Sequence, residues 1–382
     1  MQNLTLTQTC VMAILQTIVV LVFIFVLVPL TTFAERKVIG YIQDRLGATR
    51  IAGHRIGLTG ALNRGMWKLG KVPFLSILRG LPIFVGDIVK LLVKEDIVPD
   101  KADRAIFLVA PAISMVASVV VFAAISFYPG ALFTFPRAFP VVGGLPFTGF
   151  LTNMNVGLLF ILGIASVGVY GIVLGAWASN SKYPLLGGLR SAAQIVSYEV
   201  PLTLSLLVPV VLSGSLNFND LTRATATEMP LAAMPLLAVG FLVYLTCGFA
   251  ETNRLPFDMP EAENELVAGF HTEYSGMRFG LFYLAEYINM IVVSALASAF
   301  FLGGPYLLPF GLHRFIASWP LLGAPNALWF LGKIIFLLFT FIWVRGTIPR
   351  YRYDQVMAVA WKYLIPFTLV ELALAAAIRF MA

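Results

Sequence analysis

Apolar residues dominate long stretches of the chain, and polar segments separate these stretches along the whole length. Each stretch holds about 20 residues, the length that a helix needs to cross the hydrocarbon core of a membrane. A backbone inside lipid must satisfy its own hydrogen bonds, so such stretches are helical. The pattern predicts an all-α polytopic membrane protein with about eight transmembrane helices, near residues 11–33, 106–128, 155–179, 200–216, 232–250, 280–302, 326–344 and 356–378.

The composition supports this class. The chain has 382 residues, of which 59% are hydrophobic and only 12% charged, and its mean hydropathy is +0.88. A soluble globule is therefore excluded, and we expect one membrane domain over residues 1–382. The first basic residue is Arg36, so the first apolar stretch lacks the basic start of a cleaved signal peptide and is expected to remain as a helix.

Basic residues lie mainly on one side of the predicted topology. Twenty of the 26 Lys and Arg residues fall in the connections of that side, thirteen of them in segment 34–105. Positive charge favours the cytoplasmic side, which places both termini outside and the acidic segment 251–279 inside. A net charge of +7 with this distribution points to a membrane rather than to nucleic acid.

Segment 34–105 is the least regular connection. Between Asp44 and Asp87 it has seven basic residues and no acidic one, with Trp67 and apolar residues among them. Such a segment is expected to lie at the headgroup level rather than to cross the membrane. The sequence leaves open whether it binds anionic lipid or contacts a partner subunit.

The chain has few candidate metal ligands. Its two cysteines, Cys10 and Cys247, are predicted to lie near opposite membrane faces, and its three histidines have no ligand spacing. We therefore expect no disulfide, metal site or iron–sulfur cluster in this chain. Any electron-transfer centre is expected in a partner.

The segment from Glu251 to Gly280 gathers an unusual amount of acid for so apolar a chain. Prolines and apolar residues lie between its carboxylates, which indicates a packed segment rather than a solvated connection, the usual role of an acidic loop. On a helix Glu261 and Glu265 would share one face. Crowded carboxylates have raised and coupled pKa values, so we expect some of them to exchange protons near neutral pH.

Ionisable residues within the apolar stretches are costly and are often functional. Glu286 and Lys333 lie well inside two predicted helices, and we expect a functional role for both. Lys362 and Glu371 lie nearer helix ends, where a snorkelling or interfacial position is an equal alternative. Glu199 is predicted to open the fourth helix, directly before Val200 and Pro201.

Several short sequence motifs together resemble those of one family. "ETNRLPFD" followed by "PEAENELVAGFHTEYSG" is similar to the acidic loop of the membrane-embedded H subunit of NADH–quinone oxidoreductase (respiratory complex I), which is subunit 1 in mitochondria. Further matching words follow the family order: "AERKVIGYIQDRLG", "GDIVKLLVKE", "LRSAAQIVSYEV", "LAEYINM" and "WVRGTIPRYRYDQ". The resemblance covers nearly the whole chain.

The resemblance implies a subunit of an enzyme complex, with quinone as bound substrate and no redox centre of its own. It implies iron–sulfur and quinone-site soluble subunits and proton-channel membrane subunits as partners, within a bacterial inner membrane rather than an organellar one. It places along the quinone chamber Glu35, Arg36, Asp87, Lys90, Arg254, Phe257, Asp258, Arg345, Arg350 and Arg352. It places in the proton relay Glu199, Glu251, Glu261, Glu263, Glu265, Glu273, Glu286 and Tyr287, to which the in-membrane position adds Lys333.

Two features depart from the family. Relatives read R-x-G-P-N after the first helix, whereas Ala48-Thr49 replaces Pro-Asn here, and residues near 53–80 are expected to be an insertion. The alternatives are the homologous membrane subunit of an energy-converting hydrogenase or F420-type dehydrogenase, a stand-alone transporter, or a structural anchor. The quinone-chamber words favour the quinone enzyme, and the sequence does not specify which quinone or electron donor is used.

Overall fold

The structure is a computed structural model of the chain, and it describes residues 6–45, 47, 83–134, 145–260, 263–309, 312 and 325–381. Three predicted features fall outside these residues: the insertion near 53–80, the Ala48-Thr49 replacement and Glu261. The same holds for most of the predicted headgroup-level segment, which therefore stays a prediction.

Within the described residues, eight helices are long and apolar enough to span a membrane, which confirms the predicted class and number. The last of them joins two α-helices through a π-helical stretch. The helices are α1 (Leu6–Ile42), α4 (Arg104–Val120), α5 (Gly157–Ala178), α6 (Lys182–Ser213), α8 (Met234–Glu251), α10 (Gly276–Phe300), α13 (Ala327–Thr347), α14 (Tyr353–Ala358), the π-helical stretch (Val359–Leu364) and α15 (Ile365–Met381).

The first helix is longer than predicted. α1 continues to Ile42 rather than ending near residue 33, so Glu35 and Arg36 belong to the helix and not to a connection. Glu, Arg and Lys are good helix formers, so hydropathy ends at these residues while the helix does not. The chain leaves the helix near Asp44, whose φ of 54° is left-handed.

The fourth membrane helix also begins earlier than predicted. α6 starts at Lys182 rather than near residue 200, so Glu199 lies inside the helix instead of opening it. Polar residues lower the hydropathy of the first half, but Gln194 is fully buried there by protein contacts. Pro201 and Pro209 are tolerated inside this helix, which ends at Gly214 with a left-handed φ of 76°.

Short elements complete the fold. One is an antiparallel hairpin of β1 (Tyr128–Thr134) and β2 (Pro146–Gly149), so the all-α prediction is wrong for this segment. The side chain of Gln16 ties it to α1 by donating to Thr148 Oγ1 at 2.7 Å. The other short elements are α3 (Ile83–Val93), α7 (Phe218–Thr227), α9 (Glu263–Leu266) and single 3-10 turns, one of them at Gly269–His271.

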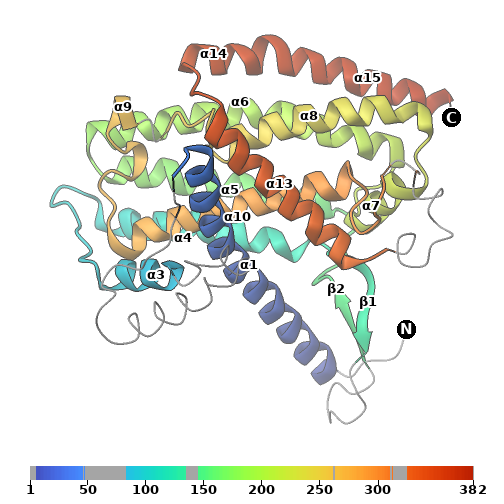
Figure 1. The fold of residues 1–382 in the computed structure, drawn as a ribbon, viewed down its shortest axis with the longest axis horizontal. Coiled ribbons are helices and arrows are strands. Elements are labelled where there is room, and N and C mark those ends of the chain that lie inside the picture. Colours follow the sequence, from blue (N-terminus) through green and yellow to red (C-terminus); the bar gives the residue numbers. More distant parts are fainter. Residues whose placement is uncertain are drawn as a thin grey trace.

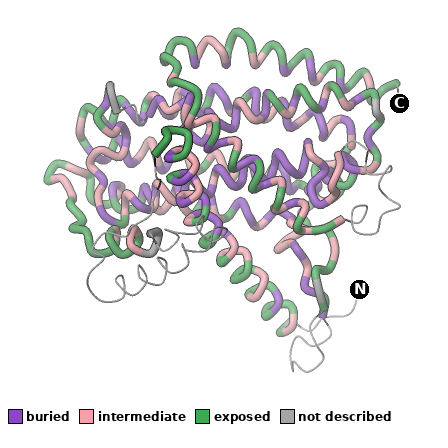
Figure 2. Tube along the Cα trace, in the orientation of Figure 1, coloured by how far each residue is buried: buried purple, intermediate pink, exposed green. Residues whose placement is uncertain are grey.

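The long helices form a bundle with α10 at its centre (Figure 1). α10 packs against α1, α4, α8 and α13, and 67% of its most apolar stretch is buried, compared with 22% for α1 and 17% for the last span. Figure 2 shows buried positions gathered in the middle of the bundle and exposed positions on its outer helices. The central position of α10 therefore places Glu286 in the protein interior.

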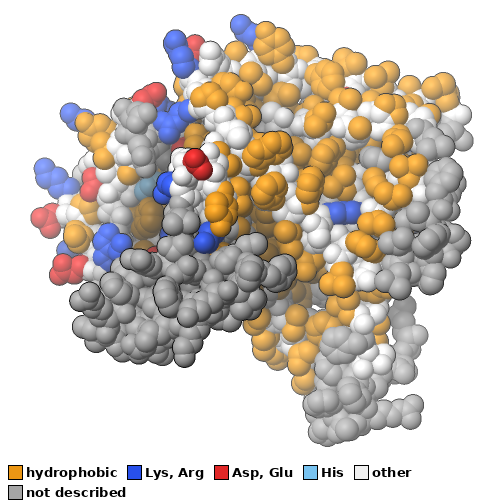
Figure 3. All heavy atoms as spheres, viewed as in Figure 1, with side chains coloured by type: hydrophobic (Ala, Val, Ile, Leu, Met, Phe, Trp, Pro, Cys, Tyr) orange, Lys and Arg blue, Asp and Glu red, His pale blue; other side chains and the backbone are white. Residues whose placement is uncertain are grey.

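Charged side chains gather at one end of the bundle. In Figure 3 most Lys, Arg, Asp and Glu side chains of the visible face lie near α3, α9 and the start of α14, whereas hydrophobic side chains cover the rest of that face. The beginning of α1 and the end of α15 both lie toward the opposite end (Figure 1). This distribution agrees with charge on one membrane side, and the assignment of that side to the cytoplasm stays a prediction.

Candidate functional site

The acidic segment folds back against α6 instead of extending away from the bundle. α8 ends at Glu251, and the Thr252 hydroxyl caps it by donating to the Gly248 carbonyl at 2.9 Å. The Nε2 atom of Gln194 on α6 then holds the loop, at 2.8 Å from the Ala250 carbonyl and 2.7 Å from the Phe257 carbonyl. These contacts bury the backbone between the two carbonyls and direct Arg254 inward.

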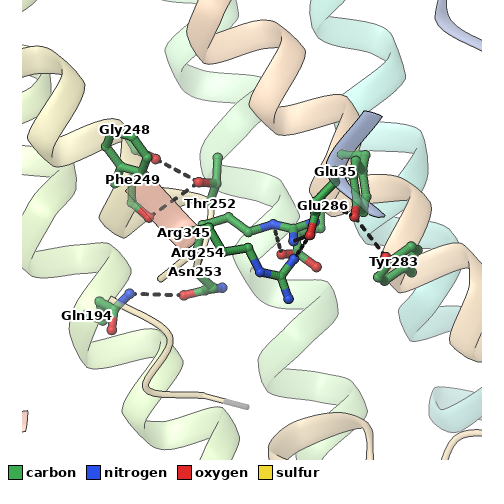
Figure 4. A network of polar contacts seen from close by, with 11 residues as sticks. Glu35, Gln194, Gly248, Phe249, Thr252, Asn253, Arg254, Tyr283, Glu286 and Arg345 are labelled. Atoms are coloured by element: carbon green, nitrogen blue, oxygen red, sulfur yellow. Dashed lines mark hydrogen bonds and ion pairs between the residues drawn. The ribbon is translucent and has the colours of Figure 1, made fainter. Parts of the chain in front are cut away.

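Arg254 is the centre of a buried ion cluster, shown in Figure 4. Only 5% of its side chain is exposed. Its Nε lies 2.6 Å from Glu286 Oε1 on α10, and its Nη1 lies 3.4 Å from Glu35 Oε1 on α1. Arg345 on α13 pairs with the same oxygen of Glu35. Two carboxylates and two guanidinium groups from three helices and the loop thus meet in the interior.

The charge of Arg254 is fixed by its surroundings. Burial by itself lowers the pKa of this guanidinium, but Glu286, Tyr287 and Glu35 raise that pKa well above its ordinary value. The guanidinium also lies over the Tyr287 ring, 4.3 Å from the ring centre. Arg254 therefore stays cationic at every pH of interest.

Two tyrosine hydroxyls extend the cluster along α10. Tyr287 donates to Glu35 Oε2 at 2.6 Å, and the hydroxyls of Tyr283 and Tyr287 are 2.8 Å apart. The two residues are four positions apart, which places them on one face of the helix. A hydrogen-bonded row therefore connects α1 to the interior face of α10.

A cavity of about 60 Å³, lined by both polar and apolar residues, adjoins the cluster. This volume holds a few water molecules. Ser166 donates to Glu199 at the wall. The lining includes the predicted relay acids Glu199, Glu251 and Glu286, together with Ser114, Ser166, Asn253, His271, Tyr283 and Asn289.

His271 contributes an imidazole ring to the lining of this cavity. Burial lowers its pKa from 6.5 to about 4, so the imidazole is neutral near pH 7. Its ring contacts Phe270 and Phe279 edge-on. The cavity therefore presents carboxyl groups and neutral donors and acceptors, which are groups that can pass a proton.

The predicted chamber residues fall into three groups. Glu35, Arg254 and Arg345 belong to the ion cluster. Asp258 and Arg350 pair at 3.3 Å. Phe257 is buried, and its ring centre lies 5.4 Å from that of Tyr198 and 5.8 Å from that of Tyr351. The remaining residues lie at the surface: Arg36 pairs with Asp87 at 2.6 Å, Lys90 is exposed on α3, and Arg352 pairs with Asp354.

The predicted relay residues are not all brought together. Glu199, Glu251 and Glu286 line one cavity, and Tyr287 joins the cluster beside it. Glu265 is exposed and pairs with Arg190 on α6 at 2.5 Å, and Glu273 is half-buried in the loop. Glu261 and the side chain of Glu263 lie outside the described part of the chain.

Lys333 of α13 lies beside the C-terminal end of α10. Its ammonium group donates to the carbonyls of Leu302, Gly304 and Tyr306, which follow the last turn of that helix. Carbonyls at a helix C-terminus carry partial negative charge and attract a cation. The sequence predicted a functional cation here, and the structure places it away from the ion cluster.

Several neutral polar residues of the site were not predicted. Gln194, Asn253, Tyr283 and Asn289 have no charge, so a search for ionisable residues in apolar stretches does not find them. A signal for Tyr283 was its spacing of four from Tyr287, and Gln194 was an amide inside a helix. Only the folded chain shows that they face the same interior.

Among the described residues, no three His, Cys, Asp or Glu side chains lie together as metal ligands. Cys10 is exposed near the start of α1, and Cys247 is buried near the end of α8. The prediction that this chain holds no metal stays a prediction.

Known proteins match this chain over nearly its whole length. The family model for NADH dehydrogenase matches residues 15–376. The NADH-quinone oxidoreductase H subunit of Rhodospirillum centenum is 42% identical over 363 residues, which cover 95% of this chain and 92% of that protein. The chain belongs to the family of NADH-quinone oxidoreductase H subunits.

Other H subunits are similarly close. That of Syntrophotalea carbinolica is 41% identical over 370 residues, with 97% of this chain and 96% of the relative covered. An H subunit of Geobacter metallireducens is 44% identical over 344 residues, with 89% and 88% covered. The resemblance inferred from the acidic loop is thereby confirmed.

Proposed function

We propose that this chain is the membrane subunit of a proton-pumping NADH:quinone oxidoreductase. It forms part of the quinone-binding chamber and couples quinone reduction to proton translocation through clustered glutamates. The observation that carries the proposal is the link from Arg254 of the loop to Glu286 of the central helix, beside a cavity lined by Glu199 and Glu251. The names of the bacterial relatives supply the reaction.

The quinone chamber is proposed on the α1 side of the cluster. Glu35, Arg36, Ile39, Arg45 and Gly47 line an open pocket of about 310 Å³. Glu35 belongs both to this pocket and to the ion cluster. The side chain of Glu35 would thus lie between a quinone headgroup in the pocket and Arg254.

The coupling step follows from how the cluster shares its cations. Quinone takes up two electrons and two protons to become quinol, and the electrons come from an iron–sulfur cluster in a partner subunit. Arg254 forms ion pairs with both Glu35 and Glu286. Negative charge developing near Glu35 attracts Arg254, which leaves Glu286 less compensated and favours its protonation. A proton taken up there passes to Glu251 or Glu199 through the shared cavity.

The partners follow from the same roles. The charged end of the bundle is the docking side for the quinone-site and iron–sulfur soluble subunits, and lipid with the proton-channel membrane subunits covers apolar outer faces. We place the complex in a bacterial inner membrane, since the curated relatives are bacterial proteins.

Glu286→Gln tests the proposal in the intact complex. The amide keeps the size of the side chain but cannot take up and release the proton, so we expect assembled complex with reduced proton pumping in inverted membrane vesicles. Glu228→Gln is the control, because Glu228 is exposed and its ion pair among the described residues is with Arg223, at 3.6 Å. Unchanged pumping per NADH in Glu286→Gln contradicts the proposed role, and a complex without iron–sulfur subunits contradicts the proposed enzyme.

A further inference from the structure

Glu371 on α15 is a buried carboxyl that the ion cluster does not use. Its exposed fraction is 2%, and neither carboxyl oxygen has a hydrogen-bond partner among the described residues. Most buried polar groups have such a partner, so an exception in a membrane-spanning helix calls for an explanation.

The packing around Glu371 leaves room for the carboxyl. Gly240 on α8 faces it: a Cβ atom at this glycine would lie 2.5 Å from Glu371 Oε1 and 3.3 Å from the Phe301 ring. Phe301 in turn packs against Phe241 and Tyr244 of α8. The buried carboxyl therefore lies beside a glycine and close to an aromatic ring.

In the described part of the chain, charged groups are absent from the stretches of α6 and α8 toward the end of the bundle where Gly240 and Glu371 lie, and from the short turn that packs on α15. α15 packs on α6, α8 and the 3-10 turn Leu231–Ala233. α6 has no charged residue after Glu199, α8 has none before Glu251, and the turn has none. On its own helix and the π-helical stretch before it, Arg379 and Lys362 are both exposed. The carboxyl thus has no facing cation among the described residues.

Glu371 lies far from the cavity along the bundle. Gly240 and Glu251 are on one face of α8, with Tyr244 and Cys247 between them at spacings of four, three and four. Eleven residues of helix correspond to about 16 Å. A group beside Gly240 is therefore separate from the cavity at Glu251.

A buried carboxylate without a partner is costly, whereas a carboxylic acid is tolerated, so the packing selects the form that carries a proton. We propose that Glu371, packed against Gly240, is a second proton-binding site of the chain, in the half of the bundle remote from the acidic loop. A proton from water adds to a carboxylate oxygen to form the acid, and its release restores the carboxylate and returns the proton to water.

Infrared spectroscopy of the purified complex tests the bound proton directly. We expect the difference spectrum between wild type and Glu371→Gln to show the carbonyl band of a protonated carboxylic acid, and this band to shift in D₂O. Gly240→Ala is a second test variant. Its Cβ atom displaces the carboxyl, so this variant should shift the frequency of the same band. Glu228→Gln, an exposed carboxyl, should not remove it. A carboxylate band in place of the acid band overturns the proposal.

Proton exchange is tested in the same variants. Glu371→Gln mimics the neutral acid in shape, so we expect it to assemble and oxidise NADH but to lose part of the proton yield per NADH. An acid band that does not shift in D₂O, together with a normal yield, overturns exchange. This last readout rests on the proposed function, while the infrared band does not. A complex that never pumps therefore rejects the function without deciding on Glu371.

Discussion

The guanidinium of Arg254 and the carboxylate of Glu286 lie 2.6 Å apart, and this contact connects the acidic loop to the most buried membrane helix. The loop residue reaches the interior because Gln194 binds the backbone on both sides of it. A change at either residue therefore affects the loop and the helix together.

Arg254→Met should be among the most damaging single changes. It leaves Glu35 and Glu286 buried with one guanidinium, and removing one partner of a buried ion pair costs about 3–5 kcal/mol. We expect loss of assembled complex on native gels and loss of quinone reductase activity. Arg254→Lys keeps the charge but contacts fewer oxygens, and should retain more of both. Equal activity in Arg254→Met and wild type would exclude the ion cluster from function.

Glu265→Gln separates a proton-relay role from a structural role. The Arg190 pair is solvent-exposed, with 31% and 55% of the two side chains accessible, so its loss should cost at most about 1 kcal/mol. If Glu265 belongs to the relay, the variant assembles normally and pumps fewer protons per NADH. Arg190→Gln removes the same ion pair but keeps the carboxyl, so it is the matched control. Equal losses in both variants would assign the effect to the ion pair.

His271 should make the stability of the complex depend on pH. Burial lowers its pKa from 6.5 to about 4 in the folded protein. Below pH 6.5 the unfolded chain takes up a proton that the folded chain does not, so the free energy of unfolding falls as pH decreases toward 4. The full effect is about 3 kcal/mol, and above pH 6.5 none of it is lost.

The measurement for His271 is the thermal midpoint of the purified complex at a fixed scan rate between pH 7 and pH 5. The midpoint of wild type should decrease over this range, and that of His271→Gln should decrease less, because glutamine does not titrate. Parallel curves for the two proteins would remove His271 as the cause.

Gly187→Ala should loosen the loop from α6. A Cβ atom at this glycine would lie 2.7 Å from the Phe270 amide nitrogen and 2.8 Å from the Gly269 carbonyl carbon, and backbone atoms cannot yield easily. We expect faster proteolysis of the loop and lower reductase activity. Gly163→Ala is the control, since a Cβ atom at Gly163 of α5 has nothing within 4 Å. Similar proteolysis in both variants would contradict the close packing.

Much of the fold was predictable because lipid restricts the backbone. The eight predicted stretches correspond to eight helices of the described residues that are long and apolar enough to span a membrane. The predicted ends of two helices were wrong, because a helix can continue through polar residues that lower the hydropathy. α1 and α6 continue through polar residues whose partners come from elsewhere in the chain. The hairpin at Tyr128–Gly149 was missed because its short aromatic segments show no clear alternation.

The candidate site was predictable as a set of residue types but not as an arrangement. Glu286 was costly enough in an apolar helix to be noticed, while Gln194 and Tyr283 carry no charge and became visible only through contacts. Glu265 and Glu286 were both predicted to belong to the proton relay. One is exposed and the other lines the cavity, because the loop turns Arg254 inward and leaves Glu265 at the surface.

The amino-acid order by itself determined the class of the protein, the number of membrane-length helices in its described part and its family, since hydropathy and short motifs are local properties. Only the tertiary structure decided that Glu35, Arg254, Glu286 and Arg345 share one ion cluster, and that Glu371 is enclosed away from it. The reason is that burial and charge pairing depend on which helices pack together. In a chain that is apolar throughout, periodicity does not specify those neighbours.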